Sequence, residues 1–247
     1  MIFFGKSNFA ILSEIMDNSH PDFPVEEEES LSSGCPWMNK KGIKNPILDA
    51  PVDPRNMMPK LPQTPAGAQQ TVLSTERENS SIPKTGSDSN WEYPSPQQFF
   101  HALLRRDKTA EEETMESVVF VHNRVNEDSW QQVLEYENMY SKQCKNPSLQ
   151  RFVGKSEEPS PKAWIRGKLG LGGGETLFDR HDWYVDRCDL RSVRYIIDYY
   201  DTSETANADP NGFNVRIDAR PALDTLQDAY DRVRKPLVDM WTRMQSK

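Results

Sequence analysis

The sequence predicts an α+β domain, in which amphipathic helices pack with a small antiparallel sheet behind a disordered, proline-rich N-terminal leader. Apolar residues recur at three- and four-residue spacing in several segments, which indicates helices, and they alternate with polar residues in two short runs, which indicates strands. Twelve of the 18 prolines fall at or before Pro96, among polar and acidic stretches that offer little apolar surface to bury. We therefore expect a mostly disordered leader over residues 1–90 and a folded domain over residues 91–247.

Four helices are predicted from their start signals and apolar stripes. The first begins at Ser95–Gln98, where a serine N-cap, a proline at the first helical position and a capping-box glutamine follow one another. A second helix is expected over residues 110–125, and a third starts near Asn126 or Asp128. The last begins near Ala222, and Pro236 is expected to kink it or end it early. The stripes consist of Phe99, Phe100, Leu103 and Leu104; of Met115, Val118, Val119, His122 and Val125; of Trp130, Val133, Leu134, Glu137 and Tyr140; and of Leu223, Leu226, Tyr230, Val233, Leu237, Trp241 and Met244.

Two strands are predicted towards the C-terminus. Residues 193–200 and 213–218 alternate between apolar and polar side chains, and the polar loop 201–212 joins them as an antiparallel pair. The preceding segment, residues 145–176, is expected to be irregular because it is interrupted by prolines and by the glycine-rich loop 170–174. That loop is not expected to bind phosphate, since no Gly-Lys-Ser/Thr follows it.

The composition argues against several function classes. The formal net charge of −8 argues against nucleic-acid binding, which depends on neutralising phosphates. No apolar run approaches the roughly 20 residues that a membrane-spanning helix needs, and the first residues lack the pattern of a secretory signal or a mitochondrial presequence. The cysteines Cys35, Cys144 and Cys188 are far apart in sequence and form no Cys-x-x-Cys pair, so we expect reduced thiols.

The densest group of potentially reactive side chains is Phe178-Asp179-Arg180-His181-Asp182-Trp183, which holds one of the four histidines. From the residues alone, this cluster fits a structural ion-pair network as well as it fits a metal or catalytic site. A carboxylate can fix the tautomer of a metal-bound imidazole, but a zinc site would need further histidines or cysteines at ligand spacing. Haem requires only an axial ligand from the protein. By contrast, His101 is predicted to be structural or solvated and His122 to be a core residue.

Aromatic and cationic side chains elsewhere could complete a haem pocket. Five aromatic residues would be ordinary core in most proteins, but they could equally form a flat apolar slot for a porphyrin: Trp130, Trp164, Trp183, Tyr184 and Tyr195. If haem binds, some arginines should face its propionates, because a guanidinium group matches a carboxylate in two hydrogen bonds. The candidates are Arg180, Arg187, Arg194 and Arg220.

Six motifs follow one another along the chain: Ser81-Ile82-Pro83-Lys84, Trp91–Gln98, His122-Asn123 with Asn126-Glu127 and Trp130, Phe178–Trp183, Val193-Arg194-Tyr195, and Asp218–Asp224. Upstream of them, Cys35-Pro36-Trp37-Met38 resembles a haem regulatory motif. In this order and spacing the motifs resemble the cytochrome c-type haem lyase family, also called holocytochrome c synthases, and we expect a fungal member.

The resemblance implies an enzyme and a site. Members attach haem to apocytochrome c through thioether bonds between the haem vinyl groups and the thiols of a Cys-x-x-Cys-His motif in the substrate. His181 would be the catalytic residue and the axial ligand of the iron in reduced b-type haem. The implied haem-binding residues are Asp179, Arg180, His181, Asp182, Trp183, Trp130 and Arg220, and the regulatory haem motif is Cys35 and Pro36.

The resemblance also implies partners and a location. The substrate would be apocytochrome c, recognised through its N-terminal helix and its Cys-x-x-Cys-His, or the membrane-anchored cytochrome of the bc complex. The enzyme would lie in the mitochondrial intermembrane space, peripheral on the inner membrane. We expect the substrate helix in a groove between the two middle helices, beside Val118, His122, Trp130 and Leu134. Two alternatives remain: a haem carrier or sensor that forms no bond, and a scaffold without haem.

Overall fold

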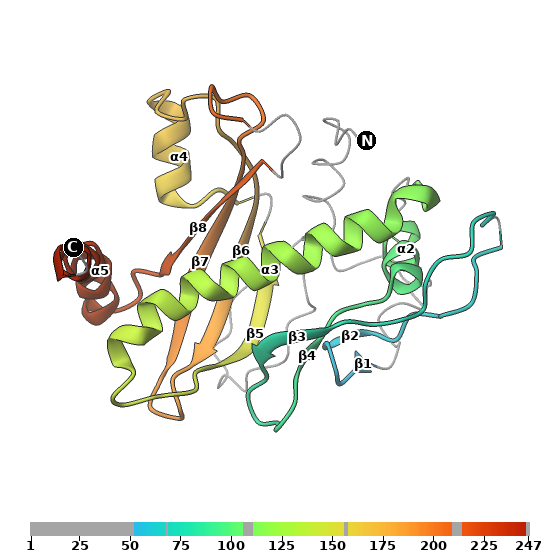
Figure 1. Cartoon of the computed structure of the whole chain (residues 1–247), viewed down its shortest axis with the longest axis horizontal. Coiled ribbons are helices and arrows are strands. Elements are labelled where there is room, and N and C mark those ends of the chain that lie inside the picture. The colour runs from blue at the N-terminus through green and yellow to red at the C-terminus, as the bar shows by residue number, and fades with distance from the viewer. Residues whose placement is uncertain (1–51, 68, 106–110, 156–157, 209–213, 246–247) are drawn as a thin grey trace, which may run out of the picture.

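The computed structural model describes residues 52–67, 69–105, 111–155, 158–208 and 214–245. A four-stranded antiparallel sheet of order β5-β6-β7-β8 forms its centre, and two two-stranded sheets, β1-β2 and β3-β4, lie beside it. Figure 1 shows α3 crossing one face of the large sheet. The predicted α+β class is confirmed. The elements are β1 Val52–Asp53, β2 Met58–Pro59, β3 Asn79–Pro83, β4 Asn90–Glu92, α2 Pro96–Leu104, α3 Met115–Glu137, β5 Ser148–Gly154, α4 Pro161–Lys168, β6 Thr176–Asp186, β7 Ser192–Asp201, β8 Val215–Pro221 and α5 Leu226–Gln245, with 3-10 turns at Glu112–Thr114 and Asn138–Tyr140.

Helix α3 is one continuous helix, and the prediction of two helices meeting near Asn126 is wrong. The polar run at Asn126–Asp128 suggested a helix start, but the Asn126 amide donates to the carbonyl of His122 at 2.8 Å, one turn earlier. Ser129 likewise donates to the carbonyl of Val125 at 2.7 Å. No proline or glycine interrupts residues 115–137, so the backbone ladder continues. The groove expected between two helices is therefore absent from the described residues.

The main core lies between α3 and the large sheet. Side chains of α3 meet the inward-facing side chains of β6, β7 and β8, and the cluster extends to the β3–β4 hairpin. Its fully or almost fully buried members include Val125, Trp130, Val133, Trp183, Val185, Val193, Tyr195, Ile197 and Tyr199. A second cluster joins α2 to the beginning of α3 through Phe99, Phe100, Leu103, Met115 and Val118. The predicted capping box of α2 is confirmed, because Ser95 and Gln98 exchange hydrogen bonds.

The folded part begins earlier than the expected boundary at residue 90. Strand β3 lies within the predicted leader, and its Ile82 is only 3% exposed in the main core. Leu73 is also buried, against α2. These residues are separated by polar neighbours, so their local composition resembles that of a leader even though single apolar side chains are buried. Residues 1–51, including Cys35 and Pro36, lie outside the described residues.

The middle and the end of the chain contain more regular structure than predicted. Within the segment expected to be irregular, β5 forms the sheet edge and α4 begins at Ser160, which caps the backbone N–H of Ala163 at 3.1 Å. The Ser160-Pro161 signal repeats that of Ser95-Pro96 and could have been recognised. Helix α5 continues through Pro236 to Gln245, so it does not end early at this proline. Pro236 lies on the exposed side of α5, where water can satisfy the carbonyl left without a partner.

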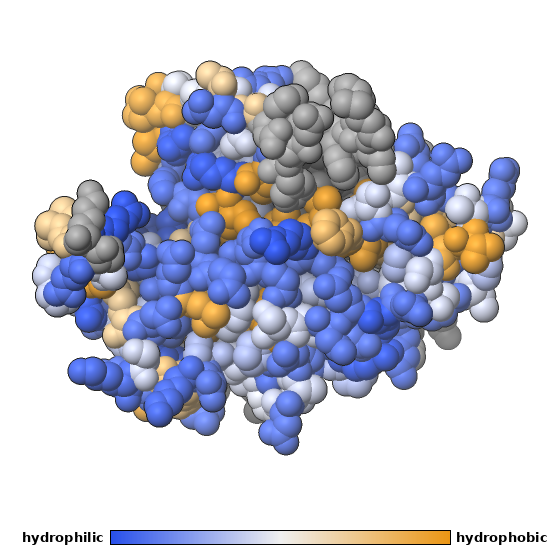
Figure 2. Space-filling view, viewed as in Figure 1, coloured by the Kyte–Doolittle hydropathy of each residue, from blue (hydrophilic) through white to orange (hydrophobic). Residues whose placement is uncertain are grey.

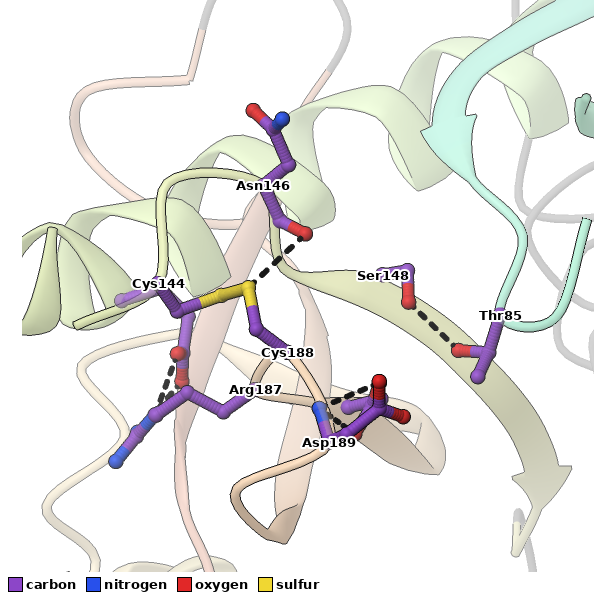
Figure 3. Close-up of a disulfide and its surroundings, with 9 residues drawn as sticks. Thr85, Cys144, Asn146, Ser148, Arg187, Cys188 and Asp189 are labelled. Carbon is purple, nitrogen blue, oxygen red and sulfur yellow. Dashed lines mark hydrogen bonds and ion pairs between the residues drawn. A yellow bond between two sulfur atoms is a disulfide. The ribbon is translucent and has the colours of Figure 1, made fainter. Parts of the chain in front are cut away.

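Two of the three cysteines form a disulfide, and the expectation of reduced thiols is wrong for them. Cys144 and Cys188 are 44 residues apart in sequence, but their Cα atoms lie 5.5 Å apart in the fold. Figure 3 shows the bond joining the loop after α3 to the turn between β6 and β7. Beside it, Arg187 donates two hydrogen bonds of 2.7 Å to Glu137 at the end of α3. The covalent bond and the ion pair hold the same end of α3 on the sheet.

Candidate functional site

A cavity with apolar and aromatic walls opens beside the main core. It lies between the β3–β4 hairpin, α2, the first half of α3 and the strands β5 and β6, and encloses about 820 Å³ including its open mouth. Its aromatic walls are Trp91, Tyr93, Phe99, Phe152 and Trp183, and it contains two imidazoles, His122 and His181. This lining is typical of sites for organic ligands, in which a few polar groups fix orientation.

His181 reaches this cavity because successive side chains of a strand point to opposite faces. Asp179, His181 and Trp183 lie on the β6 face that looks towards α3, and all three are buried. The ring of His181 stacks near Phe152, with centroids 6.4 Å apart, and meets Tyr199 edge-on at 5.4 Å. Its Nε2 lies 3.2 Å from Oδ2 of Asp179. The carboxylate thus lies against the imidazole on the same face of the strand.

His122 lies on α3 and brings a second imidazole to the same cavity, which the sequence reasoning missed. Its ring meets Phe99 and Tyr93 edge-on, at 5.3 and 6.0 Å between centroids. Burial lowers the pKa of His122 to about 4, against the hydrogen bond that His122 Nδ1 donates to Oδ1 of Asn123, which raises it; the nearby positive form of His181 lowers it further. His122 is therefore neutral at physiological pH. The sequence signal that could have identified His122 is its place in the motif His122-Asn123 with Asn126-Glu127.

The wall that faces α3 is fixed by one carboxylate of that helix. Glu127 accepts hydrogen bonds from the hydroxyls of Ser80, Ser81 and Tyr93 and from the backbone N–H of Ser81. Asn123 adds a bond of 2.8 Å from its amide to Glu78. These bonds join α3 to the segment around β3 and β4, and those to Glu127 outweigh its desolvation, so the pKa of Glu127 is lowered. The motif around Glu127 thus builds the cavity wall.

Three predicted haem contacts lie on the opposite face of the sheet. Arg180 donates to both oxygens of Asp182, and Arg194 donates to Asp182 at 2.7 Å. Arg220 donates to Asp198 at 2.5 Å and to Ser160 at 2.8 Å. None of Arg180, Asp182 and Arg220 lines the cavity. They belong to two groups of buried ion pairs, one around Asp182 and one around Asp198 beside the start of α4, because β6 and β8 turn alternate side chains away from His181.

Trp130, another predicted haem contact, lies outside the cavity. It is 2% exposed and packs in the main core between α3 and the sheet, and it does not line the cavity. Of the predicted haem contacts, the structure therefore brings Asp179, His181 and Trp183 together, and it separates Arg180, Asp182, Arg220 and Trp130 from them. His122, Phe152, Trp91 and Tyr93 are the cavity residues that the sequence reasoning did not assign.

The donor set of the cavity suits a metal that brings most of its own ligands. Among the described residues, no group of three or more histidine, cysteine, aspartate or glutamate side chains could hold a bare metal ion. A porphyrin supplies four nitrogens and needs one imidazole and flat apolar walls, which this cavity has. No helix among the described residues is long and apolar enough to cross a bilayer.

The cavity beside the core combines aromatic walls with two imidazoles, which is the kind of lining that a planar, metal-bearing ligand requires. The cytochrome c/c1 heme lyase family model matches residues 11–236, and the chain belongs to that family. It is therefore a heme lyase, an enzyme, and the carrier and scaffold alternatives are set aside.

Relatives occur in animals and fungi. The chain is 43% identical to the human holocytochrome c-type synthase over 222 residues, covering 87% of this chain and 77% of the relative. Identity to the chicken holocytochrome c-type synthase is 41%, covering 86% and 77%. Identity to the Saccharomyces cerevisiae holocytochrome-c synthase is 37%, covering 83% and 87%. Because animal relatives match at least as well as fungal ones, the comparisons do not support a specifically fungal origin. No solved structure matches the chain.

Proposed function

We propose that haem and apocytochrome c meet in the cavity that contains His122 and His181. The observation that carries this proposal is the presence of two imidazoles, the buried His181 and the half-buried His122, in one aromatic-walled cavity of a heme lyase. In each of two additions, a substrate thiol adds across a haem vinyl group: a sulfur–carbon bond forms, and the thiol proton goes to the other vinyl carbon. The protein contributes mainly by holding both partners at contact distance, which makes the additions effectively intramolecular.

The cavity offers two candidates for the iron ligand. The motif resemblance assigns the iron of reduced b-type haem to His181, whose ring is oriented by Asp179. The geometry adds His122, since its lone pair stays unprotonated down to a pH of about 4. Its Nε2 lies 3.4 Å from the Asn126 amide, a weak contact that a stronger ligand bond can replace. The first candidate rests on sequence and the second on structure.

The residues proposed to contact the porphyrin ring and its propionates differ from those predicted from the sequence. Trp183, Trp91 and Phe152 provide flat apolar surface in the cavity wall. Arg180 and Arg220 are engaged on the other face of the sheet, so a propionate needs another cation. Lys84 lies with its Nζ 4.8 Å from the ring centre of Trp91, and partial burial lowers its pKa. We assign one propionate to Lys84.

The substrate is apocytochrome c, which presents two thiols and a histidine in its Cys-x-x-Cys-His. The family description covers both cytochrome c and cytochrome c1, so the membrane-anchored cytochrome of the bc complex is a second substrate in this proposal. The enzyme also recognises the N-terminal helix of the substrate in this proposal, but through a surface other than the expected groove between two helices. A peptide with only Cys-x-x-Cys-His should then be a far poorer substrate than one extended by the preceding helix. We place the enzyme in the mitochondrial intermembrane space, peripheral on the inner membrane.

The test substitutes each cavity histidine separately. The variants His122→Gln and His181→Gln are co-expressed with apocytochrome c, and both bound haem and thioether-linked haem are measured by pyridine haemochrome spectra. We expect the ligand variant to lose bound haem and product, and the other variant to keep bound haem. His101→Gln is the matched control, because His101 lies on α2 outside the cavity and contacts the carbonyl of Thr64. Normal haem content in both cavity variants would refute the proposed site.

A further inference from the structure

Helix α5 packs on the domain through its polar side. Asp228, Asp231 and Lys235 are its buried residues, with 2%, 1% and 8% exposure, and they recur at positions i, i+3 and i+7 of one helix face. Asp228 pairs with Arg191. Tyr140 donates to Asp231 at 2.5 Å, and Lys235 pairs with Glu135 of α3 at 3.0 Å. The side that usually faces solvent in an amphipathic helix is here the side that faces the protein.

The apolar side of α5 consequently faces outwards. Tyr230, Val233, Leu237, Met240 and Met244 recur at alternating spacings of three and four residues, which places them on one stripe. All five are between 55% and 66% exposed, Trp241 beside them is 59% exposed, and Leu226 at the start of the helix is 91% exposed. A contiguous apolar surface of this kind marks an interaction site and is uncommon on a surface that meets only water.

The charges around the stripe identify the kind of partner. Two of the three aspartates of α5 point into the domain, and Asp239 pairs with Lys235 at 2.6 Å. The arginines Arg234 and Arg243 lie along the less buried sides of the helix, whereas Arg232 donates to the carbonyl of Pro221. This surface is therefore more basic than a chain with a net charge of −8 would suggest. It suits an anionic partner and disfavours a basic one such as a cytochrome.

The short helix α4 also exposes apolar side chains next to basic ones. Trp164 and Ile165 of α4 are 56% and 49% exposed, and Leu169 and Leu171 just after it are 65% and 60% exposed. The segment from Pro161 to Gly174 contains three basic residues and no acidic one. Both α4 and α5 lie towards the same end of the molecule in Figure 1, and Figure 2 shows apolar atoms gathered at the α4 end.

We propose that the outward stripe of α5, assisted by α4, lies flat on an anionic phospholipid bilayer. Helices with an apolar stripe, flanking arginines and interfacial tryptophan or tyrosine bind in the plane of the headgroups. Each basic residue near an anionic membrane surface adds to that binding. A second copy fits less well, because a stable dimer buries about 800 Å² per partner and a 20-residue helix presents a stripe only about 30 Å long. This surface accounts for the peripheral association proposed above, and it is independent of the haem site.

The test is flotation of the purified full chain with vesicles, which requires no lyase activity. One set of vesicles is phosphatidylcholine alone, and the other contains phosphatidylglycerol as the anionic lipid. We expect binding to the anionic vesicles that weakens with added salt, and at least about tenfold weaker binding for the double variant Val233→Glu/Leu237→Glu. Both positions are already exposed, so the fold should persist, and circular dichroism checks this. Trp164→Glu should weaken binding to a lesser degree.

The matched control is Phe120→Glu, the same apolar-to-acidic change at a residue of α3 that is 68% exposed. This variant should float like the unsubstituted chain. Equal flotation of the α5 double variant and the unsubstituted chain would overturn the proposal. So would light scattering showing a dimer that only the α5 substitutions dissociate, or binding of apocytochrome c that only those substitutions abolish. A loss of haem attachment with normal flotation would count against the haem site alone.

Discussion

Asp179 and His181, two residues apart on β6, bring their side chains together on one face of the sheet, with Oδ2 of Asp179 3.2 Å from Nε2 of His181. Between them in sequence, Arg180 points to the other face and pairs with Asp182, which follows His181. A single buried strand therefore separates one motif into two groups. His181 lines the cavity and is contacted by Asp179, whereas Arg180 and Asp182 pair with each other on the opposite face.

This division gives a paired prediction for the two aspartates, both of which are fully buried. If His181 binds the iron, Asp179→Asn should lower haem affinity by about 10- to 100-fold, because the orienting charge on the ligand is lost. Asp182→Asn should leave haem affinity unchanged and lower thermal stability, because it weakens the pairing of Arg180 and Arg194. Haem titration and thermal unfolding of both proteins separate the two effects. Equal haem affinities in the two variants would remove Asp179 from the site.

Substitution of Trp130 should act on stability and leave haem binding unaffected in the molecules that fold. Trp130→Ala removes a large side chain from a closely packed core, which typically costs roughly 3 to 5 kcal/mol of unfolding free energy. Chemical denaturation measures the loss of unfolding free energy. Haem titration, normalised to the folded fraction, measures the haem affinity of the variant. A stable variant with weak haem binding would restore Trp130 to the haem pocket.

Arg220 should behave as a structural residue. Arg220→Ala leaves Asp198, which is fully buried, without its main positive partner, and breaking a buried pair in this way costs roughly 3 to 5 kcal/mol. The double variant Arg220→Met/Asp198→Leu should recover much of that stability, because it removes both charges. Denaturation curves of the two variants test this. Loss of haem affinity in a stable double variant would contradict the assignment.

The lowered pKa of His122 predicts a pH dependence. Because the pKa falls from 6.5 to about 4 on folding, the unfolded chain binds the proton more readily over that interval. Stability without haem should therefore be unaffected above pH 6.5 and should decrease as the pH falls towards 4, by at most about 3 kcal/mol from this group. Denaturation at several pH values, compared with His122→Gln, isolates the contribution. An unchanged pH profile in the variant would show that His122 titrates normally.

The disulfide should contribute substantially to stability. Closing a loop across a separation of 44 residues is expected to stabilise the fold by about 4 kcal/mol in the chain-entropy model. The variant Cys144→Ser/Cys188→Ser, or reduction with dithiothreitol, should lower the unfolding free energy by an amount of that order. The double variant should be insensitive to the reductant, which provides the control. Equal stability of the oxidised and reduced chains would show that α3 is held by the Arg187–Glu137 pair without the bond.

The sequence alone predicted the elements whose signals are local. The capping box at Ser95, the alternation of β7 and the stripe of α5 depend on residues close together in the chain, and the structure contains all three elements. The order of motifs also indicated the family that the comparisons establish. Local signals gave a wrong prediction at Asn126, where polar residues suggested a new helix start. There the side-chain amide donates to the carbonyl of His122, and α3 continues.

Only the tertiary structure decided which of the predicted residues act together. His122 and His181 come from a helix and a strand that are far apart in sequence, and their shared cavity follows from the packing of α3 on the sheet. The same packing joined Cys144 to Cys188 and separated Arg220 from His181. The direction of the α5 stripe was decided by ion pairs with Arg191 and Glu135, which no periodicity reveals. Sequence spacing fixes the face of an element on which a residue lies, whereas contacts between distant elements determine what that face meets.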